Sequence, residues 1–312
     1  MVYGILAGLL WAIETVVIGL VLQNSTFVST KEAILIAPFV STFFHDMFSS
    51  IIMHIINIVK GNYKKAVSTL KTKSGKYLIL ASLIGGPIGM CGYFLAINYL
   101  GPSIGALSSA IYPAIGALLA YIFLKEDMPW YRWIFLFITL GGVFMLSYSP
   151  DLNITNFWLG LVGAFMCAFG WGIEGVILSK CMKDNIKDEY CLMIRQTVSF
   201  ITIGLIILPF IGGYQFISQI KDINIYLLIA AAGLFATLSY LCYYKAIYKL
   251  GVSKAMALNI TYVAYATIFT IVFLKDYSLL KPFNIIMIIV VLVSALCSSL
   301  EFKKRKNCSK KL

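Results

Sequence analysis

The stretch 93–127 reads YFLAINYLGPSIGALSSAIYPAIGALLAYIFLKED, and the stretch 243–277 reads YYKAIYKLGVSKAMALNITYVAYATIFTIVFLKDY. The two align without a gap, so matched positions stand 150 residues apart. The matched pairs include Ala96 with Ala246, Gly101 with Gly251, Ser103 with Ser253 and Tyr112 with Tyr262. Both stretches end on Phe-Leu-Lys followed by an acidic residue. The chain therefore contains two related halves.

A second repeated motif supports this division. Trp11-Ala-Ile-Glu14 and Trp171-Gly-Ile-Glu174 each place a Trp and a carboxylate three residues apart in an apolar run, 160 residues from each other. One half therefore carries about ten extra residues, and the Lys-rich stretch near residues 60–76 is where we place them. We expect a first repeat over 1–150, a second over 151–302 and a basic tail over 303–312.

The composition is that of a membrane protein. Of 312 residues, 60% are hydrophobic and 12% charged, with a mean hydropathy of +0.89. A soluble domain carries about 25% charged residues, and apolar runs of about 20 residues cross a bilayer as helices. The sequence predicts an all-α protein with ten transmembrane helices, at 2–23, 33–59, 76–98, 102–124, 131–149, 156–179, 190–212, 223–248, 251–274 and 280–301.

Five spans in each half is an odd number, so the second half must cross the membrane in the opposite sense. Inverted repeats of this kind are typical of secondary transporters, whose substrate sites lie near the midplane between the halves. With the N-terminus inside, 21 of the 25 Lys and Arg residues fall on segments of the cytoplasmic side. The positive-inside rule therefore predicts a cytoplasmic-membrane protein with both termini in the cytoplasm. The basic tail then meets anionic lipid headgroups, and nucleic acid is not an expected partner.

A few charged residues fall inside predicted spans, where each is costly and therefore faces a cavity or a partner. They are Glu14, His45, Asp46, Glu174 and Arg195. Two alternatives stay open from the residues alone. Arg195 can snorkel to the nearby cytoplasmic surface. The His45-Asp46 pair can serve helix packing through hydrogen bonds.

Aromatic residues recur at helical spacing beside these charges. Trp171 and Glu174 share one helix face, and similar stripes contain Tyr240, Tyr243 and Tyr244, or Asn259 and Tyr262. Such a stripe can be packing or an interfacial belt. Together with a buried carboxylate on symmetry-related spans, however, it predicts a cavity for an organic cation, since ring faces hold a cation for about 0.5–2 kcal/mol each.

The repeated stretch resembles the duplicated EamA-type domain of the drug/metabolite transporter superfamily, over nearly the whole chain. A narrower similarity is to LicB-type choline permeases, carried by HDMFS, GGPIGM, SAIYPAI, CAFGWGIE, LMIRQTVSF, YLCYYKAI and ALNITYV, in that order. This resemblance implies choline bound in an aromatic box with an acidic residue. Residue by residue it implicates Trp11, His45, Asp46, Trp171, Glu174, Arg195, Gln196, Tyr240, Tyr243, Tyr244, Asn259 and Tyr262.

Glu14 departs from the family pattern. We therefore expect Glu174 to be the essential countercharge, with Glu14 modulating the rate or the pH dependence. Glu14, His45, Asp46 and Arg195 are the candidates for coupling or gating, with protons as a possible coupling ion.

The leading hypothesis is a carrier that imports choline or a related quaternary amine, driven by membrane potential. An exporter of amino acids, metabolites or drugs is the alternative within the same class. An intramembrane enzyme is disfavoured, because no GxSxG, HExxH or nucleotide-binding glycine loop occurs. The seven cysteines form no CxxC pair, so we expect neither a disulfide framework nor a metal site, and no cofactor.

Overall fold

The computed structural model describes residues 1–100, 102–148, 154 and 156–301, without the side chains of 98 and 102–108. The elements are helical throughout this part of the chain. The helices are α1 (Val2–Leu22), α2 (Lys31–Val59), α3 (Tyr63–Thr69), α4 (Lys73–Leu83), α5 (Gly89–Leu100), α6 (Pro102–Phe123), α7 (Trp130–Ser147), α8 (Phe157–Lys183), α9 (Asp188–Thr202), α10 (Leu208–Phe210), α11 (Gly213–Gln219), α12 (Ile223–Leu250), α13 (Val252–Asn259), α14 (Tyr262–Phe273) and α15 (Pro282–Ser299).

Nine helical segments of the described chain are long and apolar enough to cross a membrane, and each coincides with a predicted span. The predicted span 102–124 is occupied by α6. Because side chains 102–108 lie outside the described residues, a tenth crossing stays a prediction. So do the repeat boundary at 150 and the tail 303–312, which also lie outside them.

The structure adds features that hydropathy did not predict. The short helices α3 and α11 follow α2 and α10 in segments that we had read as connections. Two spans contain a π-helical turn, Ile84–Ile88 between α4 and α5 and Ile203–Ile207 between α9 and α10. The span predicted at 251–274 is divided into α13 and α14 by Ile260 and Thr261. Such interruptions often occur at functional sites within helices.

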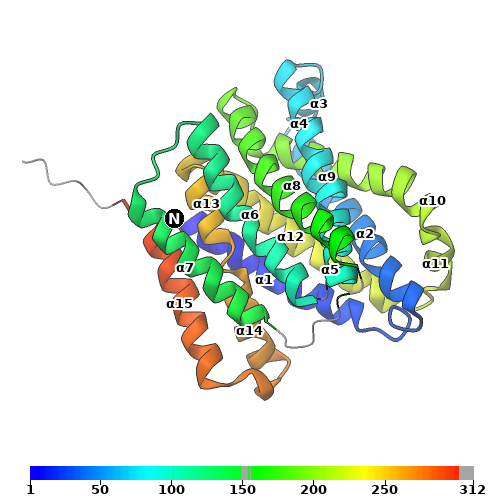
Figure 1. Cartoon of the computed structure of the whole chain (residues 1–312). Helices are drawn as coiled ribbons and strands as arrows, with labels where there is room; N and C mark the ends of the chain where they lie inside the picture. Colours follow the sequence, from blue (N-terminus) through cyan, green and yellow to red (C-terminus); the bar gives the residue numbers. More distant parts are fainter. Residues whose placement is uncertain (101, 149–153, 155, 302–312) are drawn as a thin grey trace, which may run out of the picture.

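The helix contacts made by one half recur in the other half with the roles of the halves interchanged (Figure 1). Helix α1 packs on α12, and its counterpart α8 packs on α5. Likewise α1 contacts α13 and α14, whereas α8 contacts α6. The pairs α2 with α9 and α7 with α15 join equivalent positions of the halves, and α7 and α15 lie side by side at one edge. This is the pattern expected of an inverted repeat, which remains a prediction.

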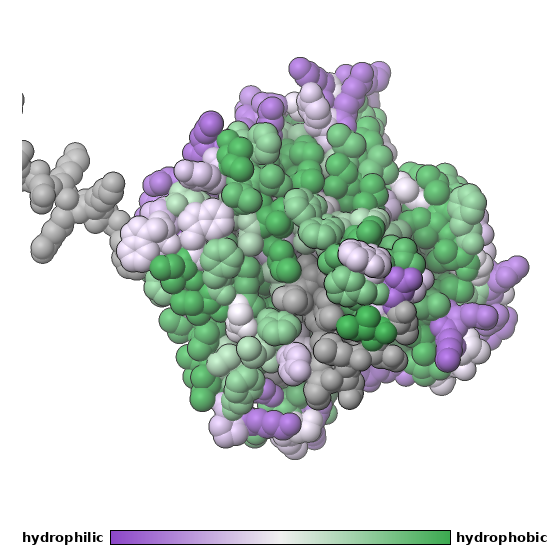
Figure 2. All heavy atoms as spheres, viewed as in Figure 1, coloured by the Kyte–Doolittle hydropathy of each residue, from purple (hydrophilic) through white to green (hydrophobic). Residues whose placement is uncertain are grey.

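The outer surface suits a bilayer (Figure 2). Large apolar side chains such as Leu205, Phe210 and Trp158 are at least 73% exposed. Hydrophobic atoms cover most of the visible side of the bundle, whereas hydrophilic atoms gather at its ends, including the end formed by α3. The protein is therefore a multi-pass membrane protein, with its polar groups in the interior and at the ends of the helices.

One acidic side chain joins the two halves at the end of the bundle predicted to be cytoplasmic. Glu126 follows α6, and its Oε1 accepts a hydrogen bond from the Val252 backbone N–H at 2.7 Å. Its Oε2 accepts from the Ser253 backbone N–H at 3.1 Å and from the Ser253 hydroxyl at 2.7 Å. Arg132 donates to the same hydroxyl at 3.0 Å. Glu126 therefore caps the N-terminus of α13 from the other half of the chain.

We expect Glu126→Ala to lower the free energy of unfolding by about 0.5–2 kcal/mol, because the first backbone donors of α13 lose their cap. Unfolding of the purified protein in detergent measures this. Asp127→Ala is the matched control, since the Asp127 side chain is exposed and only its carbonyl accepts from Arg132. Equal losses in the two variants would contradict the capping role.

Candidate functional site

A cavity of about 330 Å³ lies between the helices of both halves. Its walls come from α1, α2, α5, α6, α8, α9, α12, α13 and α14. Of the predicted site residues it brings together Trp11, Glu14, His45, Asp46, Trp171, Arg195, Tyr240, Tyr243, Asn259 and Tyr262. Three predicted site residues, Glu174, Gln196 and Tyr244, do not line it. We call this space the main cavity.

Aromatic rings form much of the main cavity's wall. Trp11 on α1 stacks on Tyr262 of α14, with ring centroids 4.4 Å apart and planes at 19°. Trp171 on α8 lies with its ring centroid 6.0 Å from that of Tyr93 on α5. Tyr243 is 8% exposed. These rings present faces and edges from both halves of the chain to the same space, which is the arrangement that holds organic cations.

Trp171 is held by the π-helical turn at Ile84–Ile88. Its indole N–H donates to the backbone carbonyl of Gly85 at 2.9 Å. A Cβ on Gly85 would lie 1.9 Å from Glu174 Oε2, and one on Gly89 would lie 2.8 Å from Trp171 Nε1. The glycines of the GGPIG motif are therefore required for α8 to bring both side chains against this turn.

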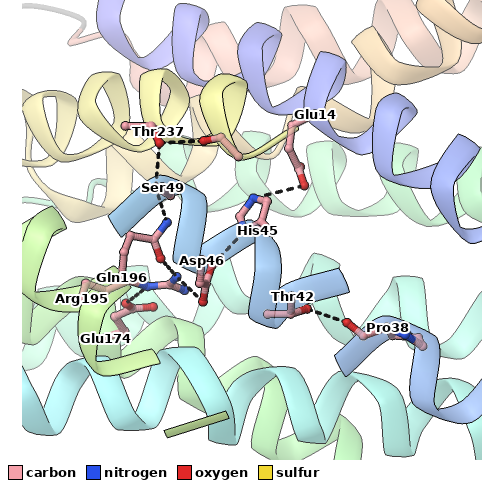
Figure 3. A network of polar contacts seen from close by, with 11 residues as sticks. Glu14, Pro38, Thr42, His45, Asp46, Ser49, Glu174, Arg195, Gln196 and Thr237 are labelled. Atoms are coloured by element: carbon pink, nitrogen blue, oxygen red, sulfur yellow. Dashed lines mark hydrogen bonds and ion pairs between the residues drawn. The ribbon is translucent and has the colours of Figure 1, made fainter. Parts of the chain in front are cut away.

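A polar network runs from one end of the site to the other (Figure 3). His45 Nε2 lies 3.6 Å from Glu14 Oε1, and His45 Nδ1 lies 2.8 Å from Asp46 Oδ1. Arg195 Nη1 is 3.5 Å from Asp46 Oδ2, and Arg195 Nε donates to Glu174 Oε1 at 3.1 Å. Glu14 and Glu174 thus occupy opposite ends of the network.

The structure decides the alternative left open for Arg195. Arg195 is 3% exposed and bonds within the network, so it does not snorkel to the surface. Gln196 is fully buried, where it accepts from Arg195 Nη1 at 2.5 Å and donates to the Ser49 hydroxyl at 2.9 Å. It therefore supports Arg195 from behind instead of lining the main cavity.

The network holds more acidic groups than basic ones. It contains three carboxylates, one guanidinium and one imidazole. With all three carboxylates ionised and His45 protonated, negative charges would outnumber positive ones by one. An unbalanced charge is costly when it is buried, because a low-dielectric interior replaces water. The site therefore favours a bound cation or a bound proton.

A second space of about 40 Å³ adjoins the main cavity, and we call it the inner chamber. Both spaces are bounded by Trp11, Trp171, Tyr240, Tyr243 and Asn259, which we call the aromatic partition. Glu174, Tyr112 and Tyr244 line the inner chamber alone, whereas Glu14 and Tyr262 line the main cavity alone. The two repeated glutamates therefore line different spaces.

Sequence reasoning missed several lining residues. Tyr93, Phe94 and Ser109 line the main cavity, and Tyr112 lines the inner chamber. The repeat held the signal for three of them, since Tyr93, Ser109 and Tyr112 align with Tyr243, Asn259 and Tyr262. From the sequence, Tyr112 was recognised in the repeat and in the α6 motif SAIYPAI, but not as a residue of the site.

Comparisons with known proteins identify relatives of this chain. The chain is 36% identical to the protein LicB of Haemophilus influenzae over 188 residues, 60% of this chain and 63% of LicB. It is 27% identical to the uncharacterized transporter YyaM of Bacillus subtilis over 214 residues, 65% of this chain and 66% of YyaM. The aligned region thus spans slightly less than two thirds of either relative.

A solved crystal structure superposes with a TM-score of 0.69 over 95% of each chain at 14% identity, which shows a shared fold. The model of the EamA-like transporter family matches residues 1–148 and again residues 158–300, so that nearly all of the described chain is covered. With its helical membrane fold and its central polar cavity, the chain belongs to the EamA-like transporter family.

Proposed function

We propose that this protein is a secondary transporter that imports choline or a closely related quaternary ammonium ion. The observation that carries the proposal is the combination of aromatic walls with an excess carboxylate in one central cavity. A quaternary ammonium ion is bulky, weakly hydrated and without N–H donors. Ring faces and a carboxylate at some distance recognise such an ion better than a set of hydrogen-bond acceptors does.

The resemblance to LicB-type choline permeases supports this substrate class. The similarity to LicB extends over 188 residues, and the motifs of the chain resemble those of LicB-type choline permeases. Glu14 faces the main cavity, whereas the Glu174 carboxylate is bound by Arg195. We therefore reverse the roles expected from the sequence: Glu14 serves as the countercharge of the bound ion in this state, and Glu174 does not contact it.

The main cavity lies towards one end of both α1 and α2. On α1 it is lined from Trp11 to Leu22, and on α2 from Pro38 to Asp46. If the N-terminus is cytoplasmic, these are the outer halves of both helices. An inside-negative potential then drives a cation inwards with about 2.3 kcal/mol per 100 mV. If the two halves are inverted repeats, rocking of one half against the other around the aromatic partition gives alternating access.

Proton coupling has a structural candidate in the His45 bridge. The ring lies between Glu14 and Asp46, 3.6 Å and 2.8 Å away. A proton on the Glu14 carboxylate removes the negative charge that the ammonium ion would otherwise neutralise, and His45 lies close enough to deliver it. Cation and proton therefore compete for the same carboxylate, and we expect apparent affinity to rise as pH rises.

Ligand-induced thermal stabilisation and proteoliposome uptake test the function together. Choline and tetramethylammonium should raise the midpoint of unfolding, because a ligand that binds only the folded state stabilises it by mass action. Ethanolamine should stabilise less, and neutral amino acids should have no effect. Labelled choline should accumulate in liposomes under an inside-negative potassium diffusion potential.

Three outcomes would contradict the proposal. Equal competition by neutral amino acids would exclude a cation site. Stabilisation by ethanolamine above choline would exclude an aromatic cage. Loss of choline from cells that overproduce the protein would show export, as found elsewhere in the superfamily.

A further inference from the structure

The aromatic partition separates two spaces that have the same chemistry. The main cavity has Glu14 on its own side of the partition, and the inner chamber has Glu174 on the other. The sequence repeat relates these carboxylates, and it also relates Tyr262 of the main cavity to Tyr112 of the inner chamber. Each space therefore offers one of the two repeated glutamates, one of the two repeat-related tyrosines and the shared rings.

The ring contacts follow the same exchange between halves. Trp11 stacks on Tyr262 at 4.4 Å between centroids, and Trp171 meets the edge of Tyr112 at 5.8 Å. In each case the Trp comes from the helix that also carries the glutamate. The two Trp–Tyr contacts are thus related by the exchange of the two halves.

In this structure the Glu174 carboxylate of the inner chamber is paired with a cationic side chain of the protein itself, that of Arg195. Arg195 Nε donates to Glu174 Oε1 at 3.1 Å. The guanidinium carbon also lies 4.9 Å from the centroid of the Tyr240 ring. A carboxylate and an aromatic face are the two partners that an organic ammonium ion uses, and here a guanidinium takes both.

The inner chamber retains unused binding groups. The Tyr244 hydroxyl and Asn259 Oδ1 are buried there without hydrogen bonds to the described residues. A volume of about 40 Å³ holds about one water and is too small for a quaternary ammonium head in this state.

Arg195 has a second carboxylate, that of Asp46, within reach. Asp46 Oδ2 is 3.5 Å from its Nη1 and accepts no hydrogen bond from the described residues. A small shift towards Asp46 would free Glu174 while the guanidinium keeps a carboxylate partner.

We propose that Glu174, Tyr240 and Tyr244 form a second cation station on the far side of the aromatic partition, which Arg195 fills in this state and which the transported ammonium ion takes when Arg195 withdraws. The inference rests on the proposed function and extends it. The ion passes from the Glu14 side to the Glu174 side of the partition, and Arg195 keeps the empty station neutral.

Binding stoichiometry tests the proposal directly. In titration calorimetry with tetramethylammonium chloride, the unaltered protein should bind one ion, and Arg195→Met should bind two because Glu174 then lacks its guanidinium. Arg195→Met combined with Glu174→Gln should return to one. Arg132→Met is the matched control, since Arg132 is equally buried but bonds at the end of the bundle, and it should bind one. A single ion bound to Arg195→Met, or two bound to the double variant, would overturn the second station.

A further variant covers the case in which Arg195→Met fails to fold. Glu174→Gln keeps the shape of the side chain, and it should reduce choline uptake at least tenfold while the dissociation constant changes less than threefold. Normal uptake, or a loss of binding in step with uptake, would overturn the second station. Failure of the unaltered protein to bind any ammonium ion would instead overturn the proposed function, so the two failures are distinguishable.

Discussion

Glu14→Gln should weaken choline binding more than a hundredfold, the largest effect that we expect of any single substitution. The side chain lines the main cavity, whereas Arg195 already engages Asp46 and Glu174. Removing one partner of a buried ion pair costs about 3–5 kcal/mol, because the other charge is left uncompensated. Glutamine keeps the shape of the side chain and deletes only its charge. Titration calorimetry with choline measures the loss.

Glu189→Gln is the matched control for this substitution. Glu189 lies in the first turn of α9 and pairs with Lys60 at an end of the bundle, where the Lys60 side chain is half exposed. An exposed pair contributes about 0–1 kcal/mol to stability and faces no ligand here. Glu189→Gln should therefore bind choline normally. Tight binding by Glu14→Gln would show that another carboxylate balances the ion, and would restore Glu174 to the role expected from the sequence.

Trp171→Ala should weaken choline binding about fivefold to thirtyfold, the second largest effect. A ring face in contact with a desolvated cation contributes about 1–2 kcal/mol. Trp171 also separates the main cavity from the inner chamber, so its loss joins the two spaces. Trp171→Phe should have an intermediate effect, because it keeps an aromatic face but loses the hydrogen bond to the Gly85 carbonyl. Calorimetry of both variants gives the order.

Tyr148→Ala is the control for the loss of an aromatic ring. Tyr148 follows α7, is 51% exposed and contacts Phe144 outside the cavity. Its removal should leave binding unchanged. If Trp171→Ala and Tyr148→Ala behave alike, the rings serve packing and the aromatic cage is wrong.

Most of the secondary structure could be predicted from the sequence, because a span through lipid must be long, apolar and helical. Nine predicted spans agree with the observed segments to within a few residues, as in α2, predicted at 33–59 and observed at Lys31–Val59. The short helices α3 and α11 were missed. They lie outside the predicted spans, where no bilayer imposes length and hydropathy.

The members of the site were predicted better than their roles. Buried charge and aromatic spacing identified ten of the residues that line the main cavity. Tyr93 and Ser109 were missed, although the repeat pairs them with Tyr243 and Asn259, because each was read as part of an alignment and not as a side chain facing a cavity.

By itself, the sequence determined the membrane-spanning segments, the repeated Trp/Glu pairs and the set of buried charges, since hydropathy, spacing and the cost of charge in lipid are local properties. Only the tertiary structure decided which carboxylate is available to a ligand. That choice depends on Arg195, which α9 places between Asp46 of α2 and Glu174 of α8. Electrostatic attraction falls with distance, and distances between residues 21 and 149 positions apart in the chain exist only once the helices have packed.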